Sequence, residues 1–140
     1  MKQTDIVLPV AALVAWTALV AMKMLYDRVT ELASVRRKAA DVQKIADKAV
    51  NYSNVRASNH FQNLFECPVL FYTLALVLLS TKAVTPMYVN ASWAYVALRL
   101  VHGVIACTYN NMIHRFIPFI LSTTLLFCMW GYYTMGLLLE

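Results

Sequence analysis

Residues 6–26 read IVLPVAALVAWTALVAMKMLY and contain one charged side chain, that of Lys23. A helix needs about 20 mainly apolar residues to cross the ~30 Å hydrocarbon core of a bilayer, and this stretch is long enough. Three further apolar stretches follow, at about residues 61–79, 89–108 and 116–139. The sequence therefore predicts four transmembrane helices, over residues 6–26 (continuing as helix to about 45), 58–80, 88–110 and 115–138.

The composition supports a membrane protein. The chain has 140 residues, of which 61% are hydrophobic and only 14% are charged. A soluble domain is about one quarter charged, so this chain has too little charge to cover a surface that faces water. No repeat or low-complexity tract divides it. We therefore predict an all-α membrane protein, a four-transmembrane-helix bundle formed by one domain, residues 1–140.

Basic residues predict how the bundle is oriented. Only Lys82 lies between the second and third helices, and Arg115 lies between the third and fourth. The connection between the first and second helices holds seven basic residues: Arg28, Arg36, Arg37, Lys38, Lys44, Lys48 and Arg56. Loops rich in Lys and Arg stay in the cytoplasm, so this charged loop is predicted to be cytoplasmic and both termini to lie outside. No basic face continues along the chain, so a nucleic-acid partner is not expected.

Aromatic residues gather near the predicted outer ends of the third and fourth helices. The two groups are Tyr88, Trp93 and Tyr95, and Trp130, Tyr132 and Tyr133. Tryptophan and tyrosine are enriched where a membrane meets water. We interpret these residues as an outer aromatic belt, in agreement with the orientation that the basic residues predict.

A polar stripe enters the second apolar stretch. Arg56, Asn59, Asn63 and Glu66 are spaced three, four and three residues apart, which places them on one face of a helix. Polar groups at this depth are unfavourable unless they face a protein interior or a wet cavity. The third helix carries a similar stripe that begins with Arg99, His102 and Ala106 and continues to Tyr109.

Two arginines and a carboxylate at matching depth suit a small zwitterionic anion. The guanidinium groups of Arg99 and Arg115 can bind carboxylates bidentately, and Glu66 can bind an amine. The alternative is structural, because polar residues also bridge helices and Glu66 could pair internally with Arg99. His102 and His114 are interpreted as packing histidines. No metal site is predicted, because neither has a cysteine or carboxylate at metal-binding spacing.

The stretch NHFQNLFECP (59–68) resembles the second-helix signature of the MAPEG family, the membrane-associated proteins in eicosanoid and glutathione metabolism. The family pattern is approximately Glu-Arg-x-x-Arg-Ala-x-x-Asn-x-x-Glu, followed shortly by Pro. Arg56, Asn63 and Glu66 match its first arginine, its asparagine and its last glutamate. Two positions depart from it: Val55 replaces the opening glutamate, and Asn59 replaces the second arginine, which helps to hold glutathione in family enzymes.

The resemblance extends to the third and fourth helices and carries implications for function. Arg99 resembles the arginine that begins the family's third-helix stripe, Arg115 lies near the arginine that activates the glutathione thiol, and Tyr109 is similar to a family tyrosine. The resemblance implies a homotrimer of left-handed four-helix bundles of a bacterial type, in the inner membrane, with sites between subunits. Glutathione would be the co-substrate, in its conjugation to a lipophilic electrophile or in peroxide reduction. The residues implied to bind it are Arg56, Asn59, Asn63, Glu66, Arg99 and Tyr109, and Arg115 is the implied catalytic residue.

Two other functions remain open. Asn59 in place of the family arginine favours a non-catalytic member of the fold that binds lipid or a partner protein. A small proton-coupled exporter would use Glu66 as its intramembrane carboxylate, but this residue lies near the end of its helix rather than at the midplane.

Overall fold

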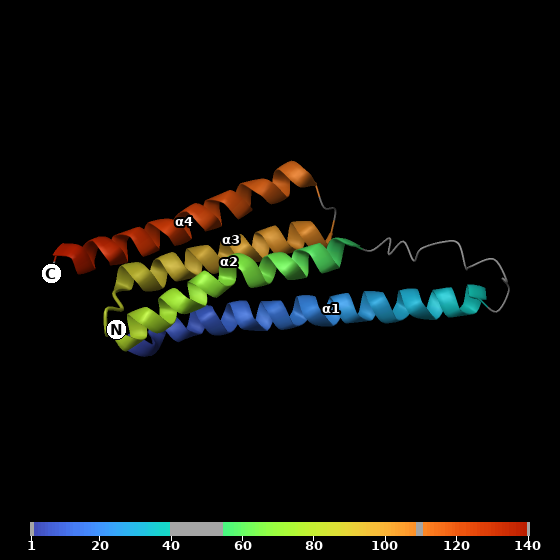
Figure 1. Ribbon diagram of the computed structural model, residues 1–140, viewed down its shortest axis with the longest axis horizontal. Helices are drawn as coiled ribbons and strands as arrows, with labels where there is room; N and C mark the ends of the chain where they lie inside the picture. Colours follow the sequence, from blue (N-terminus) through green and yellow to red (C-terminus); the bar gives the residue numbers. More distant parts are fainter. Residues whose placement is uncertain (1, 40–54, 109–110, 140) are drawn as a thin grey trace.

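The described backbone forms long helices that pack lengthwise against one another (Figure 1). The structure is a computed structural model that describes the backbone of residues 2–39, 55–108 and 111–139, and the side chains of residues 2–27, 29–30, 67–108 and 111–139. This part contains a short 3₁₀ helix, η1 (Gln3–Ile6), and four α-helices: α1 (Val7–Ala39), α2 (Val55–Ser80), α3 (Pro86–Cys107) and α4 (Met112–Leu139). The predicted all-α fold with four helices is confirmed.

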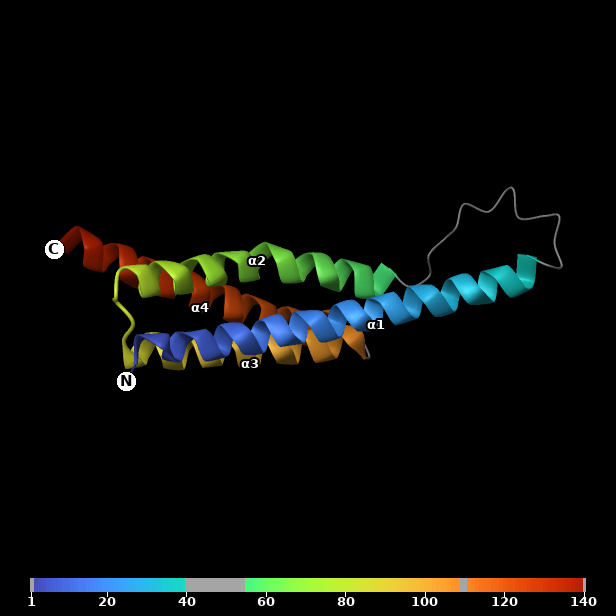
Figure 2. The same cartoon turned by 90° about the horizontal axis from the view of Figure 1, so that it is seen from below.

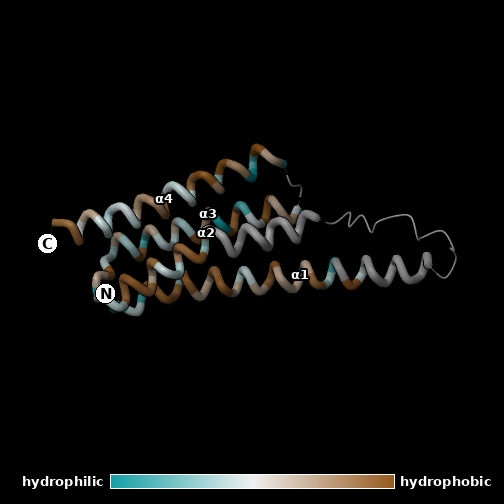
Figure 3. The backbone as a smooth tube through the Cα atoms, in the orientation of Figure 1, coloured by the Kyte–Doolittle hydropathy of each residue, from teal (hydrophilic) through white to brown (hydrophobic). Residues whose placement is uncertain are grey.

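Two of the helices have clear membrane-spanning character. Within the described residues, Gln3–Asp27 and Met112–Leu139 are long and apolar enough to cross a bilayer, and Cys67–Ser80 is a shorter apolar stretch. Figure 3 shows apolar residues on successive turns of α1 and α4. The first span ends at Asp27, whose carboxylate lies 2.9 Å from the ammonium of Lys23 one turn earlier. The pair therefore marks the polar end of the span.

The four helices run side by side with alternating direction, and the N- and C-termini lie at the same end of the bundle (Figures 1 and 2). Helix α1 contacts α2 and α3, while α4 packs mainly on α3. At 1.5 Å per residue, α1 is about 50 Å long, which exceeds the ~30 Å hydrocarbon core. Its far end accordingly projects beyond the other helices in both views. The helix continues past residue 26 to Ala39, and the rest of the predicted continuation, to about residue 45, lies outside the described residues.

The core follows from the spacing of apolar residues on each helix. On α2, Phe71, Leu74, Ala75 and Leu78 are buried at the three- and four-residue spacing of one helical face. They pack with a cluster drawn from the other elements: Ile6, Leu13, Val84, Tyr88, Tyr95, Val96, Leu126, Met129 and Tyr133. The core therefore joins all four helices.

The end of the bundle that carries the termini is closed by η1 and the connection between α2 and α3. The backbone N–H of Val84 donates to the side-chain oxygen of Gln3 at 3.1 Å. Just after the end of α2, the backbone of Lys82 adopts the left-handed region, with φ 56°. The N–H of Ala83 donates back to the carbonyl of Leu78 at 3.0 Å. This reversal is a common way to end a helix, and it turns the chain directly into α3.

The predicted aromatic belt is wrong for Tyr88, Tyr95 and Tyr133. Their side chains are 3%, 0% and 9% exposed, so they belong to the core. Tyr88 and Tyr95 are seven residues apart, which places both on the face of α3 that faces the other helices. Trp93 and Tyr132, at 45% and 61% exposed, are free to contact lipid or the interface as expected.

Candidate functional site

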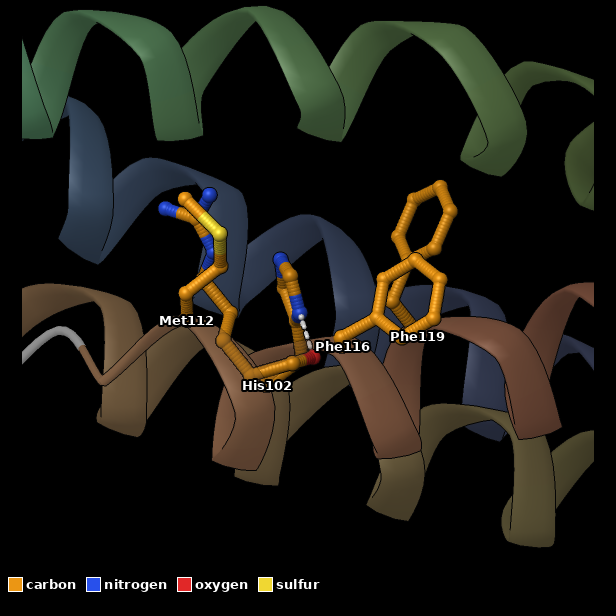
Figure 4. A pocket seen from close by; sticks show the side chains of 5 residues that line it. His102, Met112, Phe116 and Phe119 are labelled. Carbon is orange, nitrogen blue, oxygen red and sulfur yellow. Dashed lines mark hydrogen bonds between the residues drawn. The ribbon is translucent and has the colours of Figure 1, made fainter.

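A small cavity lies between the last turns of α3 and the first turns of α4. Its volume is about 170 Å³, and its walls are formed by His102, Met112, Arg115, Phe116 and Phe119. Figure 4 shows the side chains of His102, Met112, Phe116 and Phe119 on one side of the α3 and α4 ribbons. A cationic group and an imidazole thus share a cavity whose other walls are apolar. Apolar walls strengthen the electrostatic effect of a charge on a group that is held between them.

The start of α4 is fixed locally by Asn111. Its side-chain oxygen accepts hydrogen bonds from the backbone N–H of Ile113 at 3.0 Å and of His114 at 3.4 Å. Its backbone carbonyl accepts from the N–H of Arg115 at 3.0 Å. Asparagine is among the preferred residues for satisfying the first N–H groups of a helix. The cap therefore sets the helical turn from which the Arg115 side chain extends.

A hydrogen bond joins the two polar walls of the cavity. The Nδ1 atom of His102 lies 3.0 Å from the backbone carbonyl oxygen of Arg115 (Figure 4). A carbonyl oxygen can only accept, so Nδ1 carries the proton, and in the neutral ring Nε2 keeps its lone pair. The imidazole, only 3% exposed, holds the first turn of α4 against α3. Its position therefore determines where Arg115 lies relative to α3.

Arg99 lies deeper than the cavity. Its side chain is 1% exposed, and its Nε donates to the hydroxyl of Tyr95 at 3.2 Å. Its guanidinium carbon lies 5.4 Å from the centre of the Tyr95 ring and 5.2 Å from that of Phe119, within the range of cation–π attraction. Phe119 also lines the cavity, so one ring separates Arg99 from the space beside Arg115.

One donor of the Arg99 guanidinium has no partner among the described residues. This donor is Nη2, which is buried. A buried cation is strongly unfavourable unless an anion and further hydrogen bonds compensate it. A carboxylate, either from a ligand or from a side chain outside the described residues such as Glu66, is the acceptor that best matches the planar guanidinium.

We expect Tyr95→Phe to destabilise the bundle. The change removes the hydroxyl that accepts from Nε of Arg99 and leaves a second buried donor of this cation unsatisfied. Such a loss typically costs about 1–3 kcal/mol. Thermal unfolding in detergent should therefore show a lower midpoint for Tyr95→Phe than for the wild type. Tyr132→Phe removes the same atom from a side chain that is 61% exposed, and it should leave the midpoint nearly unchanged. Equal effects of both changes would contradict this account of Arg99.

The side chains of the remaining predicted site residues lie outside the part of the chain that the structure describes. The backbone of α2 carries Arg56, Asn59, Asn63 and Glu66 on one continuous helix, but their side chains lie outside the described residues, as does Tyr109. Glu66 and Arg99 are each about 20 Å along their helices from the connection between α2 and α3, because a helix rises 1.5 Å per residue. The backbone thus places these two residues at similar depth. Their assignment to a glutathione site stays a prediction.

Sequence reasoning did not select His102 or Phe119 as site residues. His102 was placed on the stripe of Arg99 but interpreted as a packing residue. Its spacing of three residues from Arg99 was the available signal. Phe119 gave no signal, because a phenylalanine in an apolar stretch is usually core or lipid-facing.

Comparison with known proteins gives one positive result. The sequence model of the MAPEG family matches residues 6–135, nearly the whole chain. Comparisons with curated proteins and with solved structures give no significant match.

Proposed function

The chain belongs to the MAPEG family, and on this premise we propose that it is a glutathione-dependent transferase or peroxidase that acts on lipophilic electrophiles. The observation that supports the proposal most is the cavity in which Arg115 and His102 meet apolar walls. A thiol with a pKa of about 8.5 is mostly protonated at neutral pH, and a cation in a poorly hydrated site favours its thiolate. Arg115 would provide that cation.

The other proposed contacts hold the remaining parts of glutathione. Glu66 and Asn63 would bind the amino-acid end of the tripeptide, and Arg56 and Arg99 would bind its carboxylates. The buried Nη2 of Arg99, which has no hydrogen-bond partner among the described residues, supports its part in this arrangement. Asn59 and Tyr109 would border the same site. The electrophile would enter from the membrane, where apolar molecules concentrate, and contact the aromatic wall formed by Phe116 and Phe119.

The chemistry that this arrangement can perform is nucleophilic. The thiolate sulfur attacks an electrophilic carbon, a carbon–sulfur bond forms, and a leaving group such as chloride departs with the bonding electrons. With a lipid hydroperoxide, two glutathione molecules instead become a disulfide while the peroxide is reduced to an alcohol and water. Both reactions require the thiolate, so both depend on the charge next to the sulfur.

A direct assay tests the proposed activity. Purified protein in detergent is incubated with glutathione and 1-chloro-2,4-dinitrobenzene, and the conjugate is identified by mass spectrometry. Enzymatic product above the uncatalysed rate, unchanged in His114→Ala, is the expected result, because His114 is exposed on the turn that also carries Arg115 but does not line the cavity. No product with this substrate or with a hydroperoxide would contradict the proposal.

We also propose that the chain assembles as a homotrimer in the bacterial inner membrane, with the charged loop in the cytoplasm. A single bundle would have to bury the predicted polar residues within itself, whereas a subunit interface gives them a shared, hydrated cavity. Native mass spectrometry from mild detergent should give three copies per particle. Monomers or dimers alone would contradict the proposed assembly.

A non-catalytic member of the family is the second candidate function. It is favoured by Asn59, which removes one of the two arginines expected from the family pattern. In that case the same fold would bind lipid or a partner protein. The assay above separates the two candidates, since the second one predicts no product.

A further inference from the structure

A second and larger cavity lies at the opposite end of the bundle from Arg115. The last turns of α4 project past the connection between α2 and α3, as both side views show (Figures 1 and 2). Between them is a cleft of about 450 Å³, whose walls include Thr81, Thr85, Tyr88, Tyr132 and Gly136. This volume lies within the range of small-molecule sites in proteins. Tyr88 and His102 are about 20 Å apart along α3, so the cleft is separate from the candidate site.

The cleft is lined by aromatic rings. Tyr88 and Tyr132 meet edge to face, with their ring centres 5.9 Å apart. Tyr133 lies on the same side and packs edge to face against Trp130, at 6.4 Å. Tyr88 and Tyr133 are 3% and 9% exposed, so two of these rings are held rigidly by the core. Rigid tyrosine rings offer flat surfaces and edges that favour another aromatic ring.

Hydroxyl groups and apolar side chains divide the cleft into two parts. Thr81 and Thr85 supply hydroxyls at the connection between α2 and α3, and the hydroxyl of Tyr133 lies 3.5 Å from that of Thr81. The wall formed by the end of α4 is apolar and includes Leu137 and Leu139. No charged residue lines the cleft in the described part of the chain. An occupant would therefore be uncharged, with a polar edge and an apolar body.

Gly136 shows that the cleft is open where α4 borders it. A side-chain carbon placed on Gly136 would meet no atom within 4 Å. The glycine is therefore not required for close packing inside the chain. A large residue at this position can extend into the cleft without displacing its walls. A substitution of Gly136 therefore tests whether a ligand binds in the cleft.

We propose that this tyrosine-lined cleft is a second binding site, for an uncharged ring compound that carries a hydroxyl or carbonyl group and partitions into the membrane. The rings of Tyr88 and Tyr132 would contact the flat body of the ligand. The hydroxyls of Thr81 and Thr85 would hydrogen-bond its polar group. A neighbouring copy of the chain is the other conceivable occupant, but transmembrane helices associate through flat surfaces of small residues, and this cleft is concave and aromatic. The proposal does not depend on glutathione chemistry.

Tryptophan fluorescence can test the proposal in the full chain. The protein carries the substitutions Trp16→Phe and Trp93→Phe, so that Trp130, which packs beside the cleft, is the single reporter. It is reconstituted in phospholipid nanodiscs. The probe is 6-bromo-2-naphthol, a neutral ring compound with a hydroxyl and a bromine atom, which quenches a tryptophan that lies within several ångströms. Saturable quenching is expected. Gly136→Phe should weaken the apparent affinity by about tenfold or more because its ring fills the cleft.

Gly131→Phe is the matched control. Gly131 lies on the same helix, and a side-chain carbon there also meets no atom within 4 Å, but it does not line the cleft. The affinity of Gly131→Phe for the probe should equal that of the protein whose single tryptophan is Trp130. If Gly136→Phe does not fold, Gly136→Leu places a smaller side chain in the cleft. Unsaturable quenching, or equal affinity in the Gly136 and Gly131 variants, would overturn the proposal. A disulfide between copies that forms only in Gly136→Cys, without probe, would show that a second chain occupies the cleft instead.

Discussion

Arg115→Ala should lower the turnover of glutathione with an aryl halide by about 10²–10³-fold, the usual effect of removing one group that stabilises a developing negative charge. The side chain lines a small cavity whose walls, apart from His102, are apolar, and apolar walls strengthen the effect of its charge on a group held between them. The charge on sulfur develops when the thiol ionises, so the loss should fall mainly on the chemical step. Rates and glutathione affinity, measured on the same preparations, separate the two effects.

Arg115→Lys serves as the control for charge alone. It keeps a cation at the start of α4 but loses the planar fork of the guanidinium. We expect it to recover part of the lost turnover. If Arg115→Ala weakened glutathione binding and left turnover at saturation unchanged, Arg115 would be a binding residue, and its proposed catalytic role would be wrong.

Glu66→Gln should act mainly on affinity. Loss of one partner from a desolvated, hydrogen-bonded ion pair typically costs about 2–5 kcal/mol, which corresponds to a weakening of the dissociation constant of roughly 30-fold or more. The proposed partner is the amine of glutathione, which is charged in both the ground state and the transition state. Calorimetry should therefore show weaker binding, while turnover at saturating glutathione changes little.

Asp27→Asn is the matched control for Glu66→Gln. It also converts a carboxylate to an amide, but Asp27 pairs with Lys23 at the end of the first span. Glutathione affinity should remain that of the wild type. If both variants lose affinity equally, a general change in charge rather than a contact of Glu66 would be responsible.

The fold could be predicted from the sequence because a bilayer permits few kinds of backbone structure. Four apolar stretches of sufficient length predict four helices, since only helices and closed barrels satisfy the backbone within a bilayer. The match of the MAPEG family to residues 6–135 confirms the resemblance that Arg56, Asn63 and Glu66 suggested. The predicted start of α4, residue 115, was approximate. The helix begins at Met112, because the cap formed by Asn111 starts it before the apolar stretch begins.

The candidate site was only partly accessible. Arg99 and Arg115 could be selected because a cation in an apolar stretch is rare and usually functional. The sequence could not show that Arg99 lies between two aromatic rings or that His102 holds the turn of Arg115, because both arrangements depend on contacts between α3 and α4. The assignment of Tyr88, Tyr95 and Tyr133 to the aromatic belt was wrong for a similar reason. Interface and core favour the same residue type, and only packing distinguishes them.

Glutathione binding to the wild-type protein tests the central claim most directly. Calorimetry measures the affinity in detergent, and ultraviolet absorbance of the thiolate, recorded on the same samples at neutral pH, measures ionisation of the bound thiol. We predict saturable binding together with a thiolate signal that is lost in Arg115→Ala. Neither binding nor thiolate in the wild type would contradict the account, and Asn59 would then mark a member of the family that has lost its glutathione site.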